Sequence, residues 1–304
     1  ITLMLSYAGI STFARAPLGS LDDAWTCDVA VLGIPFDIAL GFRPGARFAP
    51  RAIRDASLRY AVPPEGLWNW HTQKTILAGC TMRDVGDVDL PSLEPELAHR
   101  RIESCARALR ERCTVPLFLG GDHSISYPVL RAYDDIADLH VVQLDAHLDF
   151  TNERDGTRWS NSSPFRRAVE ALPGLTSIST IGLRGIRTDK EAVQSAQARR
   201  HSMVHADHVG MTGALPAGSL PTGKSVYLSI DVDVFDPSVL SGTSSPEVDG
   251  LTYRQVAGIL HAVTSLNTIV GIDCVELSPS LDPSGLSSLV VARLLVETLG
   301  MVMA

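Results

Sequence analysis

The amino-acid sequence predicts a single three-layer α/β/α domain that covers residues 1–304 and has a mainly parallel central sheet. Three observations support this prediction. Short apolar segments recur along the chain, segments with helical periodicity separate them, and no internal repeat or linker rich in Pro and Ser divides the chain. Strands that alternate with helices form parallel sheets, which helices cover on both faces.

Six apolar segments are the predicted strands. Each consists mainly of apolar residues and ends near Gly, Pro or Asp, which is typical of strands buried on both faces. They cover residues 29–35, 117–121, 139–144, 178–183, 226–230 and 268–275. We therefore expect these strands to form the covered centre of the sheet.

The segments between the strands carry helical signals. Ala98, Ile102, Cys105 and Leu109 follow the spacing of one helix face, and Thr252 is an expected N-cap for a second helix. The apolar segment at the end of the chain contains an arginine and a glutamate, so it predicts a buried amphipathic helix over 286–303 rather than a membrane span.

Two other segments predict long loops. Residues 151–164 are rich in Asn, Ser and Arg, and residues 204–224 are rich in Gly and Pro. Long loops in compact domains often carry function.

Composition narrows the classes of function. The formal net charge is -8 and no basic cluster is present, which argues against a nucleic-acid partner or an anionic membrane. Five cysteines without a CxxC pair favour reduced thiols, and residues 1–17 lack the features of a signal peptide. The sequence therefore predicts a cytoplasmic protein.

Acidic residues and histidines follow three of the predicted strands. The three motifs are Gly120-Gly121-Asp122-His123, Asp145-Ala146-His147-Leu148-Asp149 and Asp231-Val232-Asp233. The carboxyl ends of parallel strands are where ligands bind in open sheets. If the chain stays extended beyond each strand, side chains two residues apart point the same way, so the acids of each motif converge.

Such a cluster of carboxylates repels itself unless a cation neutralises it, which indicates a metal site. Two metals fit better than one, because four or more carboxylates and two imidazoles are available. Mixed oxygen and nitrogen ligands suit Mn(II), the expected metal, with Ni(II) or Co(II) as alternatives. The alternative interpretation, loop acids and hydrogen-bonded histidines, fits one motif alone better than all three.

At these motifs the sequence resembles the ureohydrolase family of arginase, agmatinase and related amidinohydrolases, and it is most similar to the agmatinase branch. The third motif extends from Ser229 to Pro237 in this comparison. The resemblance implies an arginase-like fold and a homotrimer or homohexamer. It further implies that Asp145 and Asp231 bridge two metals, with His123 and Asp149 completing one site and His147 and Asp233 the other.

The resemblance also implies a catalytic role for two carboxylates. A hydroxide between the metals would attack the guanidino carbon, and Asp149 would carry its proton. Glu276 would anchor the guanidinium group. The residues alone give weaker support for this anchor, since Glu276 follows the strand predicted at 268–275, and an exposed loop acid is the alternative.

The chain departs from the family pattern at two places. Asn161 stands where many relatives carry a histidine that is assigned to proton transfer, and an amide cannot carry a proton. Asp149, a water chain or another residue would then carry the proton, and Asn161 would bind substrate or stabilise its loop. The second departure is Gly242-Thr243-Ser244-Ser245-Pro246-Glu247, where added hydroxymethyl groups would narrow the pocket or alter a turn. Arg158 is a further candidate, for a substrate carboxylate.

The predicted activity is hydrolysis of a guanidino C–N bond to give urea and an amine, with agmatine as the expected substrate. A different guanidine, such as 4-guanidinobutanoate or a small or substituted guanidine, is the first alternative. The second is a catalytically silent subunit that keeps the fold to assemble with an active partner, although six intact ligand positions argue against it.

Overall fold

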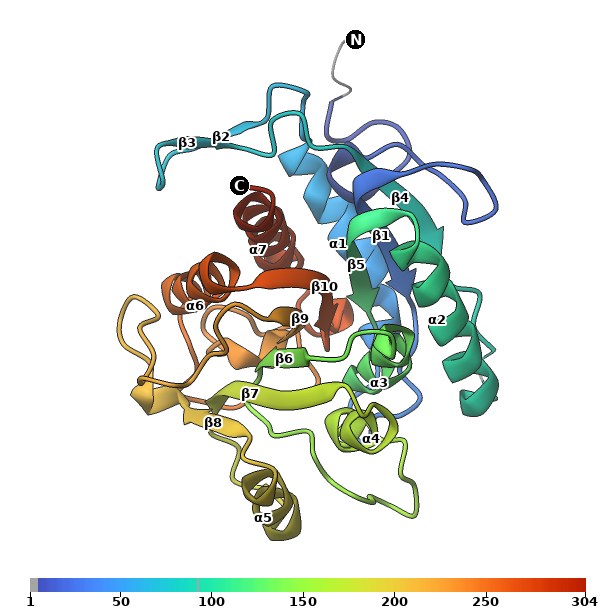
Figure 1. Cartoon of the computed structure of the whole chain (residues 1–304). Helices are drawn as coiled ribbons and strands as arrows, with labels where there is room; N and C mark the ends of the chain where they lie inside the picture. Colours follow the sequence, from blue (N-terminus) through green and yellow to red (C-terminus); the bar gives the residue numbers. More distant parts are fainter. Residues whose placement is uncertain (1–4, 92) are drawn as a thin grey trace.

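The computed structural model describes residues 5–91 and 93–304 (Figure 1). Its main sheet contains β1 (Cys27–Ile34), β4 (Met82–Asp87), β5 (Cys113–Gly120), β6 (Leu139–Leu144), β7 (Leu175–Leu183), β8 (Ser202–His205), β9 (Ser225–Asp231) and β10 (Thr268–Val275). Their order is β4-β1-β5-β10-β9-β6-β7-β8, and each neighbouring pair is parallel. All six predicted strands and the parallel sheet are confirmed.

Helices cover both faces of this sheet (Figure 1). One layer contains α1 (Ala49–Ser57), α6 (Tyr253–Leu266) and α7 (Leu286–Val302), and the other contains α2 (Pro95–Arg110), α3 (Ser126–Leu130), α4 (Pro164–Ala171) and α5 (Lys190–Ala198). Each layer packs its apolar side chains into a separate core against the sheet. The predicted three-layer α/β/α architecture is confirmed.

Several local predictions for the helices are also confirmed. Thr252 caps α6 through a reciprocal pair of hydrogen bonds with Gln255, which satisfies backbone groups that the first turn leaves free. The apolar segment near the end of the chain forms α7, and no helix in the described part of the chain is long and apolar enough to cross a membrane. All five cysteines are free thiols.

The sequence pattern missed the two edge strands of the sheet. β4 contains two aspartates and one arginine, and β8 is a short strand inside a region where we expected mainly loop. An edge strand has one neighbour and is incompletely covered, so it does not need the continuous apolar sequence of a central strand. The small antiparallel pair β2 (Leu67–Asn69) and β3 (Lys74–Ile76), which lies outside the main sheet, was missed for the same reason.

The expectation that the chain stays extended beyond the strands is wrong. After β9, Val232–Val234 form a 3-10 turn, and after β6 the chain bends so that Asp149 has a φ angle of 47°. The side chains nevertheless converge, because tight turns at the carboxyl ends of the strands aim them at the same point.

Candidate metal centre and active site

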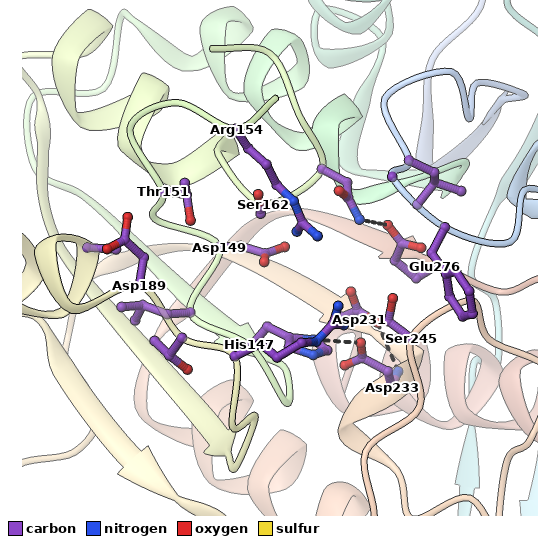
Figure 2. A pocket seen from close by; sticks show the side chains of 18 of the residues that line it. His147, Asp149, Thr151, Arg154, Ser162, Asp189, Asp231, Asp233, Ser245 and Glu276 are labelled. Atoms are coloured by element: carbon purple, nitrogen blue, oxygen red, sulfur yellow. Dashed lines mark hydrogen bonds and ion pairs between the residues drawn. The ribbon is translucent and has the colours of Figure 1, made fainter. Parts of the chain in front are cut away.

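The four central strands of the sheet position the candidate site. β5, β10, β9 and β6 are consecutive neighbours, and their carboxyl ends lie side by side. His123 begins a 3-10 turn after β5, Glu276 follows β10, Asp231 ends β9, and Asp145 follows β6. Figure 2 shows how side chains from these strand ends point into one cavity.

The predicted ligands form two groups that share one carboxylate. His123, Asp145, Asp149 and Asp231 bring one potential ligand atom each to within 4.8 Å of one another. Asp145, His147 and Asp233 form the second group by the same measure. Asp145 thus belongs to both groups, as a bridging ligand would, whereas Asp231 belongs to the first group.

Backbone amides orient the carboxylates of both groups. Asp145 accepts a hydrogen bond of 2.6 Å from the amide of His147, and Asp233 accepts one of 3.1 Å from the amide of Ala146. Asp231 accepts one of 2.9 Å from the amide of Asp233. The backbone amides in these turns therefore fix the orientation of the three carboxylates. This explains why the side chains converge although the chain is bent.

The imidazole of His123 is oriented by a chain of buried hydrogen bonds. The Ser229 hydroxyl donates to Asp273 at 2.7 Å, so it must accept from Nε2–H of His123, which lies 3.0 Å away. The Nδ1 atom then presents its lone pair to Asp149, Asp231 and Asp145, whose oxygens lie at 2.9, 3.1 and 3.2 Å. That atom is buried and has no hydrogen-bond partner, as expected of a metal ligand.

The charge of the cluster also requires a cation. Burial, together with the charge of Asp145, raises the pKa of Asp149 to about 6. Burial and two neighbouring carboxylates raise the pKa of Asp231 well above its usual value. Within the described residues, no lysine or arginine side chain forms an ion pair with the four aspartates of the two groups. Six oxygen and nitrogen ligands with this excess of negative charge fit two divalent metal ions.

Gly121, the second residue of the first motif, lies too close to neighbouring backbone for any side chain to fit. A Cβ atom at Gly121 would lie 2.3 Å from the carbonyl oxygen of Phe36 and 2.7 Å from that of Ile34. The backbone of Gly121 also donates to Ile34 and accepts from Glu276, so it joins the ends of neighbouring strands. Any side chain here would separate the strands that carry the site.

Glu276 forms part of the cavity wall beside the two groups. Its carboxylate accepts hydrogen bonds from the His123 amide at 2.9 Å, the Ser244 hydroxyl at 2.9 Å and the Asn161 amide at 3.2 Å. The side chain is buried, and burial followed by the charge of Asp122 raises its pKa to about 8. Glu276 has a left-handed φ of 65°, a backbone strain that is often found at functional sites.

The cavity above these residues has a volume of about 360 Å³. This is the size of a small-molecule site. The buried and half-buried part of its lining includes ligands of both groups together with Glu276, Asn161 and Ser245. The exposed lining residues Arg154, Arg187, Glu153 and Asp189 form its mouth. A small polar substrate can therefore reach the metal ligands from solvent.

Comparison with known proteins gives the family. The model of the arginase family matches residues 27–300. The chain belongs to the arginase family. Curated relatives include the mitochondrial guanidino acid hydrolase of Homo sapiens, 34% identical over 96% of this chain and 82% of the relative, and the mitochondrial agmatinase of Gallus gallus, 34% identical over 96% and 85%. The solved proclavaminate amidino hydrolase from Streptomyces clavuligerus superposes with a TM-score of 0.87 at 30% identity and 98% coverage of both chains.

Membership of the arginase family makes this protein an amidinohydrolase, a hydrolase of guanidino C–N bonds. The two groups of ligands correspond to the binuclear metal site of that family. The resemblance described from the motifs is thus confirmed for the family, the fold and the reaction class.

The two departures from the arginase-family pattern both contact Glu276. The Asn161 side chain donates to one carboxylate oxygen, and the Ser244 hydroxyl donates to the other. Asn161 also lines the cavity, as does Ser245. The structure therefore places these residues around the predicted guanidinium anchor, where they hold its carboxylate.

The structure does not bring Arg158 to the cavity. Its guanidinium pairs with Glu170 of α4 at 2.8 Å, because the loop after β6 turns back toward that helix. Arg154, in the same loop, lines the cavity instead. Sequence reasoning missed Arg154 and also Ser229, although a serine inside an otherwise apolar strand was a signal for the latter.

Proposed function

We propose that this arginase-family enzyme uses two divalent metal ions to hydrolyse a linear guanidine to urea and an amine. One observation carries the proposal: two ligand groups that share the buried Asp145 both contribute residues to the lining of one cavity, and the buried carboxylate of Glu276 lines the same cavity. A planar guanidinium matches a fixed carboxylate well, because two parallel N–H groups can donate to its two oxygens.

We assign the ligands to two metal positions as follows. His123 and Asp149 would hold one ion, His147 and Asp233 would hold the other, and Asp145 and Asp231 would contribute to both positions. When bound, the ions would lower the pKa of a water molecule enough to supply hydroxide near neutral pH. Two charges of this size also offset the repulsion among the buried carboxylates.

The remaining steps belong to side chains. Three hydrogen-bond donors fix the orientation of the Glu276 carboxylate. The carboxylate in turn holds the guanidinium of the substrate in its own plane. Asp149, at the cavity surface, accepts the proton of the nucleophile and returns it to the leaving nitrogen, which departs as an amine. Asn161 cannot replace the proton-carrying histidine of many relatives, so Asp149 takes this role alone.

The substrate within this class is a separate proposal. Agmatine, the substrate expected from the sequence, carries a cationic tail, and an agmatinase is among the relatives. A guanidino acid carries an anionic tail, and a guanidino acid hydrolase is among them as well. The presence of Arg154 and Arg187 at the mouth of the cavity favours the second candidate.

Four further properties are also proposals. Mn(II) is the proposed metal, with Ni(II) or Co(II) as alternatives, since oxygen and imidazole ligands accept all three. A homotrimer or homohexamer is the proposed assembly, and the cytoplasm is the proposed compartment. A small guanidine is the proposed ligand, with neither nucleic acid nor membrane as a partner.

The first test is urea release combined with metal analysis. Metal-free protein is reloaded separately with Mn(II), Ni(II) and Co(II), and each form is offered agmatine, 4-guanidinobutanoate and small guanidines. We expect two ions per chain and urea from at least one guanidine. Two bound ions with no urea from any guanidine would instead support a silent subunit that needs an active partner.

A further inference from the structure

A cationic side chain stands at the mouth of the cavity without a close acidic partner. The Arg154 guanidinium has Asp155 as its nearest ion-pair partner in the described part of the chain, at 3.9 Å, which exceeds hydrogen-bond distance. Four residues further along the same loop, Arg158 forms an ion pair of 2.8 Å with Glu170. Arg154 is thus available to a ligand, whereas Arg158 is occupied.

The position of Arg154 relates it to the substrate rather than to solvent alone. A Cβ atom at Gly41 would lie 3.8 Å from its Nη2 atom, so the guanidinium reaches the loop that forms another part of the cavity lining. Figure 2 shows its side chain extending toward Asp149 and Ser162. Glu276 and Arg154 line the same cavity, so a guanidine held by Glu276 shares that space with the Arg154 guanidinium.

From this geometry we infer that Arg154 binds a carboxylate at the far end of the substrate and selects guanidino acids over agmatine. The inference rests on the proposed hydrolysis of a linear guanidine. An arginine fork can donate two parallel hydrogen bonds to a carboxylate. The terminal ammonium of agmatine would instead meet a like charge and find no acceptor on this side chain.

Two acids at the mouth of the cavity, Asp189 and Glu153, could attract a cationic substrate, but they differ in how available their carboxylates are. Asp189 caps α5 by accepting a hydrogen bond of 2.9 Å from the amide of Glu191, so its carboxylate is already engaged. Glu153 is exposed beside Arg154 and is the competing candidate, since it could receive a cationic tail. Arg187 adds a second exposed cation to the lining.

The test compares substrates that differ in the charge of the tail. 4-Guanidinobutanoate, its neutral amide 4-guanidinobutanamide, and agmatine are compared by kcat/KM in metal-loaded protein. Because the Arg154 side chain is 42% exposed, water screens its charge, and we expect the acid to exceed the amide by about ten- to a hundred-fold. The Arg154→Gln variant should lose this preference, because its kcat/KM for the acid should fall much more than its kcat/KM for the amide.

A matched control lies in the same loop. Arg158→Gln removes one positive charge of the same kind outside the cavity, so the ratio of acid to amide should stay at its original value. Charge reversal in Arg154→Glu should move the preference toward agmatine. Calorimetric binding of the product 4-aminobutanoate to metal-loaded protein should weaken in Arg154→Gln, whereas binding of 4-aminobutanamide should not.

The outcomes separate this inference from the proposed function. If no guanidine yields urea although two metals are bound, the proposed function fails. Urea release with no preference for the acid, or a preference that survives Arg154→Gln, overturns the role of Arg154 and leaves the hydrolase intact. A preference for agmatine that disappears in Glu153→Gln would overturn it in favour of a cationic substrate.

Discussion

Two buried clusters of charge in this protein differ in how they are neutralised. In the first, Arg54 of α1 donates to both oxygens of Asp84 at 2.8 and 3.0 Å and to Asp87 at 2.5 Å, with side-chain exposures of 8% and 1% for Arg54 and Asp84. In the second, four aspartates and two histidines converge at the carboxyl ends of β5, β6 and β9 without an arginine or lysine among them in the described chain.

This difference distinguishes a cluster that serves folding from one that serves chemistry. The chain supplies the cation for Asp84, so that cluster is complete once the protein folds. In the described part of the chain, neither a lysine nor an arginine pairs with Asp231, whose pKa is raised by burial and by neighbouring carboxylates. Bound metal must supply the positive charge that the second cluster needs. Because binding relieves the repulsion among the buried carboxylates, that repulsion increases the affinity of the cluster for metal.

The largest expected effect is on the shared ligand of the second cluster. Replacing Asp145 with Asn should abolish urea release and greatly weaken both metal positions, because a neutral amide cannot bridge two cations as a carboxylate does. Metal content by elemental analysis and urea release check this together. Turnover at the level of the unaltered protein would rule out the bridging role of Asp145.

The second prediction compares the two clusters directly in metal-free protein. Asp84→Asn should lower the free energy of unfolding by about 3–5 kcal/mol, because it leaves Arg54 with one partner fewer in a buried site. Asp231→Asn should raise it by about 1–3 kcal/mol, because it removes one of several repelling carboxylates.

Denaturant unfolding of the two variants and the original chain, after removal of metals, measures both effects. The same sign for both variants would contradict the distinction between the clusters. With Mn(II) added, Asp231→Asn should have a lower free energy of unfolding than the original chain. The original chain then gains more stability from metal binding.

A third prediction concerns the residues around the substrate. Glu276→Gln should keep both metals and lower kcat/KM by about ten- to a hundred-fold, because it removes the charge that anchors the guanidinium. Asn161→Ala should act in the same direction but by about ten-fold at most, since it removes one of three hydrogen bonds to that carboxylate.

Metal stoichiometry serves as the control for both variants, and it should remain at two ions per chain. Loss of metal from Glu276→Gln would show that this residue belongs to the metal site. A larger defect in Asn161→Ala than in Glu276→Gln would give Asn161 a role of its own.

The smallest effect concerns buried groups that are kept neutral. Burial lowers the pKa of His99 to about 4, and burial with the charge of Arg199 lowers that of His201 to about 4. Folding therefore favours the neutral rings. Their contribution to stability is complete above the unfolded pKa of about 6.5 and is lost as the pH falls toward 4.

Unfolding in urea at pH 7 and pH 5 should show a decrease on the order of 1–2 kcal/mol from each of these two histidines. The double variant His99→Gln, His201→Gln should lose less stability over the same interval. Equal losses in both proteins would mean that other groups, the carboxylates of the site among them, account for the whole pH dependence.

Most of the fold could be predicted, and the reason lies in burial. The strands β5, β6, β9 and β10 lie at the centre of the sheet under helices on both faces, so their sequences are mainly apolar. The edge strands β4 and β8 have mixed polarity and gave no such pattern.

The metal ligands could be predicted for a related reason. Acids and histidines directly after buried strands must lie at one edge of a parallel sheet, and repulsion among them indicates a cation. The turns that aim these side chains were not predicted. Val232–Val234 form a 3-10 turn that the Asp231 side chain caps, and Asp149 has a left-handed φ of 47°, and the apolar pattern that predicts the strands indicates neither.

The sequence by itself determined the arginase-like fold, the six candidate ligands and the reaction class, because these depend on local pattern and on the order of strands. Only the tertiary structure decided which arginine of the loop after β6 faces the cavity. Arg154 and Arg158 are equivalent as sequence, but Glu170 on α4 engages Arg158 and leaves Arg154 at the mouth. Folding brings Glu170 next to Arg158, and the local sequence of the loop does not indicate that contact.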